Sequence, residues 1–262
     1  AFLANAVYYL EQALRKNGYE SFLCCTGYEL ENKKNYLRLL LSKRVDAVIL
    51  VGSHYLEANK ADNEYIIAAA EEVPVMMING YLNHPNIYCT LCDDYQAVYD
   101  AVVRLAAHGR KRFAFLYRSD SSSSRIKMKG FKEGIAAAGL TLSEDSVKFC
   151  PNDILLTKNL LTDLYHEGSS YDAILTSEDS LAVAAVKFAG SIGLRVPEDL
   201  EIVGYNNSLL CICTEPELST LDNHVETLSI TTVNTLMRVL QGADVPNKTM
   251  ISNDFIARGT AY

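Results

Sequence analysis

The chain has 262 residues, of which 49% are apolar and 21% charged, and its 24 basic and 32 acidic side chains give a net charge of −8. This size and composition are typical of an ordinary soluble globular protein with two lobes. The acidic balance excludes broad binding of a nucleic-acid backbone by this segment, because such binding needs clustered Lys and Arg. No run approaches the ~20 apolar residues that span a bilayer.

The first part of the chain alternates helix and strand patterns. Val7, Leu10 and Leu14 repeat at helical spacing in a helix that Gly18 ends. Apolar runs predict strands at 21–26, 45–51 and 73–78, with helices over 36–41 and 64–71. A strand near 87–91 then leads to a helix over 95–107, which Gly109 stops.

The same pattern then starts again. It predicts strands at 113–117, 147–150, 173–176 and 201–205, separated by helices over 126–138, 158–165 and 181–192. A long helix over 225–240, a turn at 242–246 and a short apolar stretch at 255–257 follow. Repeated strand–helix units with apolar strands predict an α/β fold of parallel sheets flanked by helices, and two such series predict two similar lobes.

The amino end and the cysteines indicate the compartment. The opening residues, AFLANAVYYL, lack the basic start and the cleavage site of a signal peptide, and without an initial Met we expect a fragment of a longer chain. The seven Cys, an odd number, fit buried thiols in a reducing cytoplasm. The CxxC of Cys89 and Cys92 has no second ligand pair of zinc-site type, so we expect no metal.

Polar residues follow the predicted strands, and this is where a ligand is expected. Open parallel sheets bind ligands beyond the carboxyl ends of their strands. The residues at these exits are Thr26, Ser53, Asn79, Arg118, Asn152, Glu178 and Asn206. Donors and acceptors in this number suit a polyhydroxylated ligand, although loops are polar for other reasons too.

No catalytic constellation stands out. The sequence has no GxSxG, GxxxxGK[ST] or HExxH motif, and its five His are scattered. Asp93–Asp94 and Glu178–Asp179 are acidic pairs, but neighbouring residues of a helix point about 100° apart and make a poor acid/base couple. Acids at a helix start also stabilise its dipole. We therefore expect no enzyme and no cofactor.

The stretch at 171–207, YDAILTSEDSLAVAAVKFAGSIGLRVPEDLEIVGYNN, closely resembles the lactose-repressor/galactose-repressor (LacI/GalR) family of bacterial regulators. That family typically shows "DAI…ND…A…GA…G.RVPEDV.VVG[FY]DD". The segments at 45–52, 92–116, 124–131 and 214–221 also resemble family motifs, in the family's order, so the resemblance covers essentially the whole chain.

The resemblance implies two flavodoxin-like lobes of the periplasmic-binding-protein type, joined by three crossovers near Gly109, Asp222 and Lys248. The N-terminal lobe is then 1–109 plus 222–248, and the C-terminal lobe is 110–221 plus 249–262. It also implies a homodimer, an effector in the cleft between the lobes, and a helix-turn-helix ahead of residue 1 for operator DNA. Ala1 aligns at the first helix, so the first strand of the lobe is expected to precede it.

Family ligand residues can be carried over one at a time. The family's Arg falls at Lys127, with Arg125 nearby as a substitute; the "ND" pair falls at Glu178–Asp179; the first Asp after "G[FY]" falls at Asn206; and an aromatic position falls near Asn152. Arg can grip two vicinal hydroxyls, whereas Lys is a point donor. With the strand exits and matched segments, the expected ligand contacts are Lys127, Arg125, Asn206, Glu178, Asp179, Asn152, Asp93, Ser124, Asn79 and Ser53.

The sequence therefore predicts the effector-binding and dimerisation module of a cytoplasmic transcription repressor, whose effector is expected to be a sugar. A secreted sugar-binding protein of a transporter is the alternative, because it shares this fold. The odd number of Cys and the VPED and PELST segments favour the regulator. An enzyme on a doubly wound sheet is the third reading, with no motif to support it.

Overall fold

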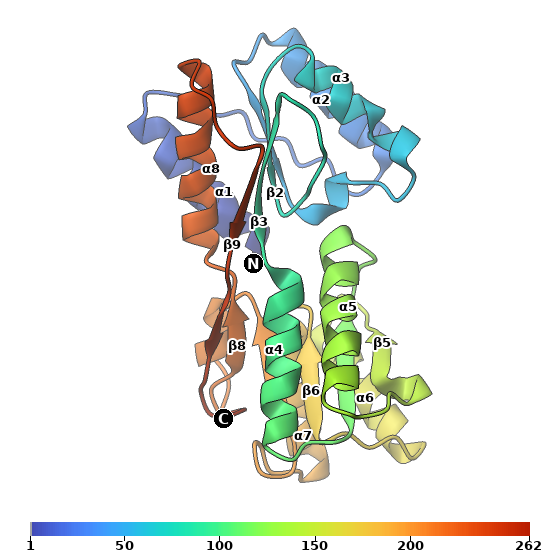
Figure 1. Ribbon diagram of the computed structural model, residues 1–262. Coiled ribbons are helices and arrows are strands. Elements are labelled where there is room, and N and C mark those ends of the chain that lie inside the picture. The colour runs from blue at the N-terminus through green and yellow to red at the C-terminus, as the bar shows by residue number, and fades with distance from the viewer. Residues whose placement is uncertain (1) are drawn as a thin grey trace. The chain divides into compact units, whose positions relative to one another are not determined.

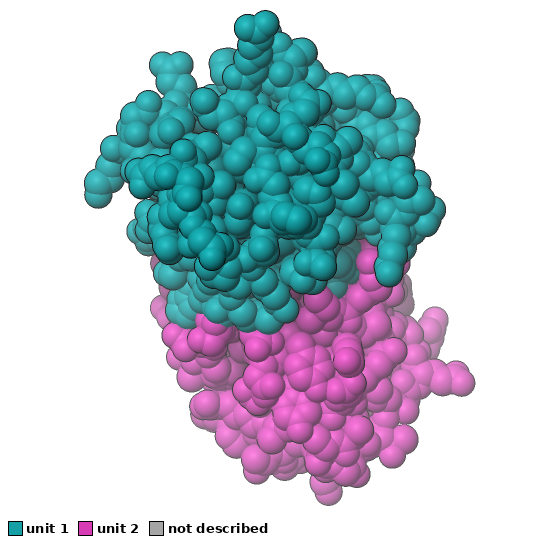
Figure 2. Space-filling model, turned by 45° about the horizontal axis from the view of Figure 1, so that its top comes forward, with its two compact units in different colours: residues 1–92, 121–123, 224–251 teal, residues 93–120, 124–223, 252–262 magenta. Residues whose placement is uncertain are grey.

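The computed structural model describes residues 2–262. The chain forms two compact units (Figure 2). Unit 1 comprises residues up to 92 with 121–123 and 224–251, and unit 2 comprises 93–120, 124–223 and 252–262. None of the helices described has both the length and the apolar character needed to span a lipid bilayer.

Unit 1 is built on a four-stranded parallel sheet in the order β1-β2-β3-β9. Its strands are β1 (Val48–Val51), β2 (Val75–Ile78), β3 (Ile87–Cys92) and β9 (Lys248–Ile251), and its helices are α1 (Phe2–Lys16), α2 (Leu30–Ser42), α3 (Glu64–Ala70) and α8 (Val225–Leu240), with short 3-10 turns η1 (Ser53–Tyr55) and η2 (Lys60–Asn63). Helices α1 and α8 lie on one side of the strands and α2 and α3 on the other (Figure 1).

The pairing of α1 with α8 shows why the amino end is helical. Ala6, Leu10 and Leu14 stand four residues apart and are at most 9% exposed, and Leu10 and Leu14 pack with Leu236 of α8 and with Ile78 of β2. Each buried Leu side chain contributes roughly 1.5–3 kcal/mol to folding. The helical spacing read from the sequence is confirmed here.

The predicted strand at 21–26 is wrong. Residues 19–27 carry no regular secondary structure, although the sequence SFLCCT is of strand type. A strand requires a neighbour whose peptide groups lie within hydrogen-bond reach, about 4.8 Å away. In this structure a cavity lies between Phe22 and β1, so the segment has no strand beside it.

Unit 2 is built on a six-stranded sheet in the order β10-β8-β7-β6-β4-β5, parallel except for the β10–β8 pair. Its strands are β4 (Phe113–Tyr117), β5 (Val147–Phe149), β6 (Ala173–Thr176), β7 (Glu201–Tyr205), β8 (Ser219–Asp222) and β10 (Asp254–Ile256), and its helices are α4 (Asp94–Ala107), α5 (Ser122–Ala137), α6 (Ile154–His166) and α7 (Asp179–Ile192), with 3-10 turns η3 (Glu144–Ser146) and η4 (Leu209–Ile212). Helices α4 and α5 cover one face and α6 and α7 the other (Figure 1). The predicted α/β fold with helix-flanked parallel sheets is confirmed.

Helix α4 belongs to unit 2, whereas the expected lobe boundary near Gly109 placed it in the first lobe. The reason is its apolar face: Val98, Val102 and Leu105 are buried against Phe113 and Phe115 of β4. The chain therefore passes from unit 1 to unit 2 at 92–93, before the helix.

Gly130, the glycine of the GF motif, allows α5 to pack tightly against α4. A Cβ at Gly130 would lie 2.4 Å from the Tyr95 carbonyl oxygen, far inside van der Waals contact. Only a residue without a side chain fits, so this motif position reports helix packing and not ligand contact.

The cysteines are all free thiols, and their burial differs from the expectation. Cys89, Cys92, Cys150 and Cys211 are buried, whereas Cys25 and Cys213 are exposed and Cys24 is half-buried. Cys24 and Cys25 lie in the irregular segment 19–27 and line the smaller of two cavities in unit 1. Among residues 2–262 no group of three or more His, Cys, Asp or Glu side chains is placed to hold a metal.

Candidate ligand-binding site

Polar residues gather at the carboxyl edge of the unit 2 sheet. Strands β4 to β8 of this sheet are parallel, so the residues that follow them meet at one edge, and the antiparallel β10 begins there. The residues at this edge are Arg118, Asn152, Ser177, Glu178, Asp179, Asn206, Asn207, Asp222, Asn223 and Asn253. The edge therefore brings together four of the predicted residues, namely Asn152, Glu178, Asp179 and Asn206.

Lys127 reaches this edge from α5 and is 6% exposed. Its ammonium lies 3.4 Å from the centroid of the Tyr205 ring and donates to the Ser177 carbonyl oxygen at 3.3 Å. An ammonium has three donors, and a buried charge is costly unless paired, so Lys127 retains donors for a ligand.

Tyr205 supports Lys127 from below. The tyrosine is fully buried, and its hydroxyl donates to the Asp94 carboxylate and accepts from Asn253 Nδ2 at 2.7 Å. The two bonds hold the ring beneath the ammonium, where the ring face attracts a cation. The Asn253 Oδ1 atom is buried and has no hydrogen-bond partner among the described residues, which leaves an acceptor at the edge.

Two asparagines follow β7 in the left-handed region of the backbone, with φ of +103° at Asn206 and +48° at Asn207. Asn tolerates this region better than most residues. The Asn207 side chain is engaged at both ends, because it donates to Asp222 at 3.0 Å and accepts from Arg258 at 2.7 Å. Asn206 accepts from Asn223 at 2.8 Å, and its own side-chain amino group donates to no described residue.

The acidic pair Glu178–Asp179 stands at the start of α7, and its two residues have different roles, of which that of Asp179 is structural. Asp179 is 2% exposed, and its oxygens accept from the Ser208 backbone N–H at 2.8 Å and from the Thr220 hydroxyl at 2.7 Å. Burial raises the pKa of Asp179, and these two bonds oppose the shift. A Cβ at Gly204 would lie 2.3 Å from Asp179 Oδ1, so the glycine makes room for this carboxylate. Asp179 thus connects the start of α7 to the segment after β7 and to β8, and its role is structural.

Glu178 remains half-buried at the surface of the edge. It accepts from Arg118 and from the Ser180 hydroxyl at 2.6 Å. The Arg118 guanidinium also donates to the Asn152 side chain, so one arginine links the ends of β4, β5 and β6. Arg118 limits the freedom of both predicted residues and fixes their positions.

Two α5 residues differ in position. Ser124 is 6% exposed and lies 3.4 Å from the Ser119 hydroxyl, on the same buried side as Lys127. Arg125 points outward and donates to the Asp120 carboxylate at 3.0 Å. The structure therefore does not bring Arg125 to Lys127 as a second cation.

The other predicted residues have local structural roles or lie in unit 1. The Asp93 carboxylate caps α4 by accepting from the Gln96 N–H at 3.1 Å. Asn79, with φ of +59°, ends β2 and accepts from the Cys92 N–H at 3.1 Å. Ser53 begins η1 directly after β1 and is half-buried. Asn79 and Ser53 stand at the carboxyl edge of the unit 1 sheet, and their ligand contacts stay predictions.

Two cavities of about 310 and 620 Å³ lie in unit 1 beside β1. None of the ten predicted residues lines either of them. Their walls combine Leu, Val and Phe side chains with polar residues, among them Lys33 in the smaller cavity and Lys43 and Asp46 in the larger. These cavities are therefore a feature separate from the polar edge of unit 2.

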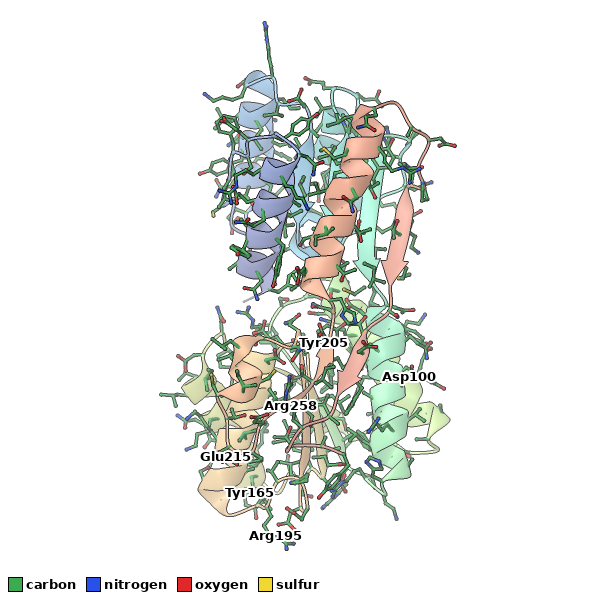
Figure 3. All side chains as sticks on the ribbon, turned by 90° about the vertical axis from the view of Figure 1, so that its left-hand side faces the viewer. Asp100, Tyr165, Arg195, Tyr205, Glu215 and Arg258 are labelled. Atoms are coloured by element: carbon green, nitrogen blue, oxygen red, sulfur yellow. The ribbon has the colours of Figure 1, made fainter. Side chains whose placement is uncertain are left out.

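The RVPED motif lies at the opposite end of unit 2. Figure 3 shows Tyr205 at one end of the unit 2 strands and Arg195 at the other. Arg195 grips Asp199 through two bonds of 2.9 and 2.6 Å, and this arginine holds the pKa of Asp199 at about 2. The motif that identifies the family thus closes a turn and takes no part in the polar edge.

Sequence reasoning missed Tyr205, Asn207, Asp222 and Asn253. Asp222 ends β8, which was not predicted as a strand, and Asn253 precedes β10, which returns to β8 from the end of the chain. The signal that was available is the second Asn after GY, which matches the second Asp of the family's motif.

A family model described as periplasmic binding proteins and the sugar-binding domain of the LacI family matches residues 1–259. The chain belongs to this family. The LacI-family chain is 61% identical over 259 residues to an HTH-type transcriptional regulator of Lachnoclostridium phytofermentans, covering 99% of this chain and 78% of that protein. The chain thus acts in transcription regulation and is not an enzyme.

Solved structures share the fold. The lac repressor dimer bound to operator and the anti-inducer ONPF matches with a TM-score of 0.88 at 21% identity, over 98% of this chain and 88% of that one. A complex of the transcriptional regulator CelR with cellobiose matches with a TM-score of 0.83 at 22% identity, over 99% and 79%. At these identities the likeness establishes the architecture of the LacI-family chain.

Proposed function

We propose that this chain is the effector-binding module of a bacterial transcription regulator, and that it binds a small polyhydroxylated molecule, a sugar, at the carboxyl edge of the unit 2 sheet. The observation that carries the proposal is the buried Lys127 ammonium, which keeps donors for ligand oxygens. The ligand acts by binding more tightly to one of two conformations that differ in affinity for operator DNA.

The edge offers both kinds of hydrogen-bond partner that sugar hydroxyls need. Lys127 and the Asn206 amino group donate, while Asn253 Oδ1 and the Glu178 carboxylate accept. Each hydroxyl loses water on binding and must find a protein partner, because an unmade bond costs about 1–3 kcal/mol. A mixed set of donors and acceptors therefore favours a sugar over an apolar ligand.

The regulator as a whole is proposed from the relatives. The relative at 61% identity is named an HTH-type regulator, and the lac repressor structure is a dimer on its operator. We extend both properties to this protein: a homodimer that contacts operator DNA through residues ahead of Ala1, in the cytoplasm. The net charge of −8 fits a segment that leaves DNA contact to another domain. The regulator names favour this function over a secreted transport protein.

The ligand is sought first by thermal shift with cellobiose, ribose, glucose and adenine. A ligand at 100 times its Kd should add about 2.7 kcal/mol to the free energy of unfolding. Adenine is the contrasting ligand, since it lacks the hydroxyls that the edge is proposed to bind.

The site is then tested by calorimetry with the sugar that binds. Lys127→Met keeps the length and apolar stem of the side chain and should weaken binding by at least about tenfold, since a bond to a charged donor contributes roughly 1.5–3 kcal/mol. Lys129→Met is the matched control, because Lys129 is on the same helix and 67% exposed. Unchanged affinity in both Lys127→Met and Asn206→Ala would refute the site.

The switch is tested with the full-length protein and its operator. The sugar should change the affinity for operator DNA by about 5–150-fold in a gel-shift titration, the usual range of allosteric coupling. A sugar that binds the module and leaves operator affinity unchanged contradicts the regulatory role and keeps the binding site.

A further inference from the structure

Two lysine side chains are buried among residues 2–262, and they differ in how their charge is matched. Lys33 of α2 is 3% exposed and Lys127 of α5 is 6% exposed. Removing an ammonium from water is costly unless an opposite charge and hydrogen bonds replace the water. The partners of each lysine therefore indicate what the site around it is suited to hold.

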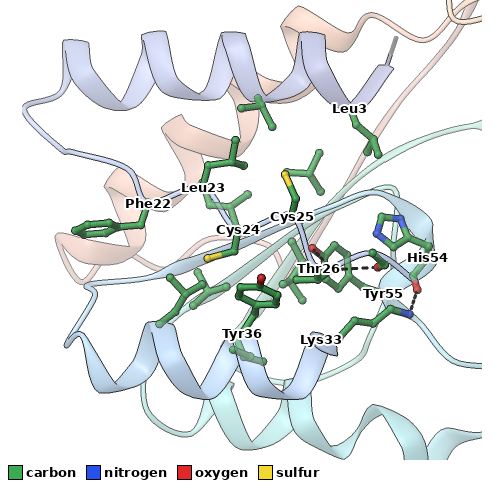
Figure 4. A pocket seen from close by; sticks show the side chains of 18 of the residues that line it. Leu3, Phe22, Leu23, Cys24, Cys25, Thr26, Lys33, Tyr36, His54 and Tyr55 are labelled. Carbon is green, nitrogen blue, oxygen red and sulfur yellow. Dashed lines mark hydrogen bonds between the residues drawn. The ribbon is translucent and has the colours of Figure 1, made fainter. Parts of the chain in front are cut away.

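Lys33 has its counter-charge within the protein. Its ammonium donates to the Glu57 carboxylate and to the His54 carbonyl oxygen, each at 2.6 Å (Figure 4). Hydrogen bonds of this length between an ammonium and a carboxylate are strong, because both partners are charged. In unit 1 the chain thus pairs a buried ammonium with a carboxylate of its own.

Lys127 has partners of a different kind. Its ammonium donates to the Ser177 carbonyl oxygen at 3.3 Å, a long bond, and lies 3.4 Å from the centroid of the Tyr205 ring. A carbonyl oxygen and a ring face carry a partial negative charge, and neither carries a full one. The full negative charge that Glu57 provides to Lys33 can be provided to Lys127 by a ligand.

Carboxylates at the same edge of unit 2 are engaged with other groups. They accept hydrogen bonds from a guanidinium, from hydroxyls, from a side-chain amide or from a backbone N–H, and they are Glu178, Asp179, Asp94 and Asp222. The Arg118 guanidinium and the Glu178 carboxylate match each other's charge. The Lys127 ammonium therefore gives this edge a positive charge that is available to a ligand.

The two residues after β7 remove negative charge from the edge. The family motif has two aspartates after G[FY], whereas this chain has Asn206 and Asn207. A carboxylate accepts protons from sugar hydroxyls and repels an anion, whereas an amide amino group donates to either kind of oxygen. The amino group of Asn206 donates to no described residue, so it is a second donor for a negatively charged group.

Helix α5 favours an anion for a further reason. Ser124 precedes Lys127 by three residues, so the two lie on one face of the helix, and each is 6% exposed. The helix begins at Ser122, so this face is at its N-terminal end, where the unpaired backbone N–H groups attract negative charge. The lysine and the helix end therefore act on a bound anion in the same direction.

We propose that the effector carries a carboxylate or a phosphate on its polyhydroxylated skeleton, and that this anionic group binds to the Lys127 ammonium. The inference rests on the proposed ligand site at the carboxyl edge of unit 2 and adds the charge of the ligand to it. The ligand then has the role for Lys127 that Glu57 has for Lys33. Lysine suits this role, because its compact charge binds a single oxyanion, whereas arginine grips two oxygens at once.

Matched pairs of ligands test the charge preference by calorimetry with the full-length protein. Glucuronate and glucose 6-phosphate are each compared with glucose, and galacturonate with galactose, because each pair differs by one anionic group. At least one acidic sugar should bind at least about tenfold more tightly than its neutral partner. The carboxylate and phosphate arms identify the anionic group.

The outcomes separate this inference from the proposed function. A neutral sugar that binds as tightly as its acidic partners overturns the inference and leaves the proposed function intact. Absence of binding by every sugar, neutral or acidic, overturns both.

Variants of Lys127 test its part with the acidic sugar that binds. Lys127→Met should abolish the preference for the acid over its neutral partner, while Lys127→Arg keeps the positive charge and should retain the preference. Lys129→Met is the matched control, since Lys129 is on the same helix and 67% exposed. A preference that persists unchanged in Lys127→Met overturns the assignment of the anionic group to Lys127.

The ligand-free protein gives a test that is independent of the choice of sugar. Lys127→Met removes a buried charge that the protein leaves unmatched, so it should raise the Tm by roughly 2 °C or more. Lys33→Met is the comparison variant: it leaves Glu57 without its ammonium and should lower the Tm by roughly 5 °C or more. A Tm that falls in Lys127→Met as it does in Lys33→Met shows that the protein itself matches the Lys127 charge, and it overturns the inference.

Discussion

The two ends of the unit 2 sheet differ in how completely their polar groups are paired. At the amino end, fully buried Glu201 accepts from Arg110 at 3.0 Å and from the Tyr262 N–H at 3.1 Å, and Arg110 also donates to two carbonyls around Pro197. At the carboxyl edge, Lys127 and Asn206 keep donors that no described residue uses. The paired end carries the family's motif, and the other end carries the site proposed for the ligand. A family can therefore be identified from residues that say nothing of its ligand.

The comparison predicts that damage at the amino end affects stability alone. Glu201→Ala leaves the Arg110 guanidinium without its carboxylate, and Arg110 is only 16% exposed, so the free energy of unfolding should fall by about 3 kcal/mol. Urea denaturation measures this loss, and sugar affinity should stay within about twofold. Glu198→Ala, an exposed neighbour, should change stability by less than about 0.5 kcal/mol. A tenfold loss of affinity in Glu201→Ala would break the separation of the two ends.

A change beneath the carboxyl edge should affect both properties. Gly204→Ala forces a methyl group against Asp179, which anchors Ser208 and Thr220, and should cost about 1–3 kcal/mol in stability together with ligand affinity. Gly190→Ala is the matched control: it lies in α7 with open space around it and should stabilise by about 0.5–1 kcal/mol. Calorimetry and thermal melts measure both. Normal affinity in a destabilised Gly204→Ala protein would show that the edge does not depend on Asp179.

The smallest effect concerns the Arg195–Asp199 pair. Arg195 lowers the pKa of Asp199 from 3.8 to about 2 in the folded protein. Because the folded pKa lies below the unfolded one, the pair stabilises the fold above pH 4, and this contribution is lost as the pH falls towards 2. Carboxyl NMR titration should give a pKa near 2 in the wild type and a clearly higher pKa in Arg195→Gln, in which the backbone N–H of residue 195 still donates to Asp199. The same pKa in both proteins would mean that the pair is not formed in solution.

The sequence predicted the repeated strand–helix pattern well. The helix over 225–240 and the strands at 173–176 and 201–205 have the predicted bounds: each strand is a short, mostly apolar run, and the helix carries apolar residues at helical spacing. The segment 21–26 failed because a strand depends on a partner that composition does not reveal. Helix 94–107 was placed with the wrong sheet, since an apolar stripe shows that a helix is buried and not which strands cover it.

The candidate site was predicted in part, for a physical reason. Lys127, Glu178 and Asn206 lie at the polar edge and remain candidates for ligand contact. The side-chain oxygens of Asp179, Asp93 and Asn79 instead accept hydrogen bonds from nearby backbone N–H groups or hydroxyls. Residue type and position at a strand exit do not distinguish these two uses. Tyr205 and Asn253 were missed because their roles arise from contacts between segments 48 residues apart.

The order in which the segments leave the ribosome has a consequence for folding. Unit 1 needs α8 and β9, and unit 2 needs β10 with the buried Thr260 and Ala261, all of which come from the last forty residues described. Neither core can close while the chain is still being extended through residues 1–220. The nascent chain must carry the face of α1 that packs on α8 uncovered until synthesis is nearly complete. Both units therefore fold after translation of this region, and chaperones have the greatest opportunity to act at that stage.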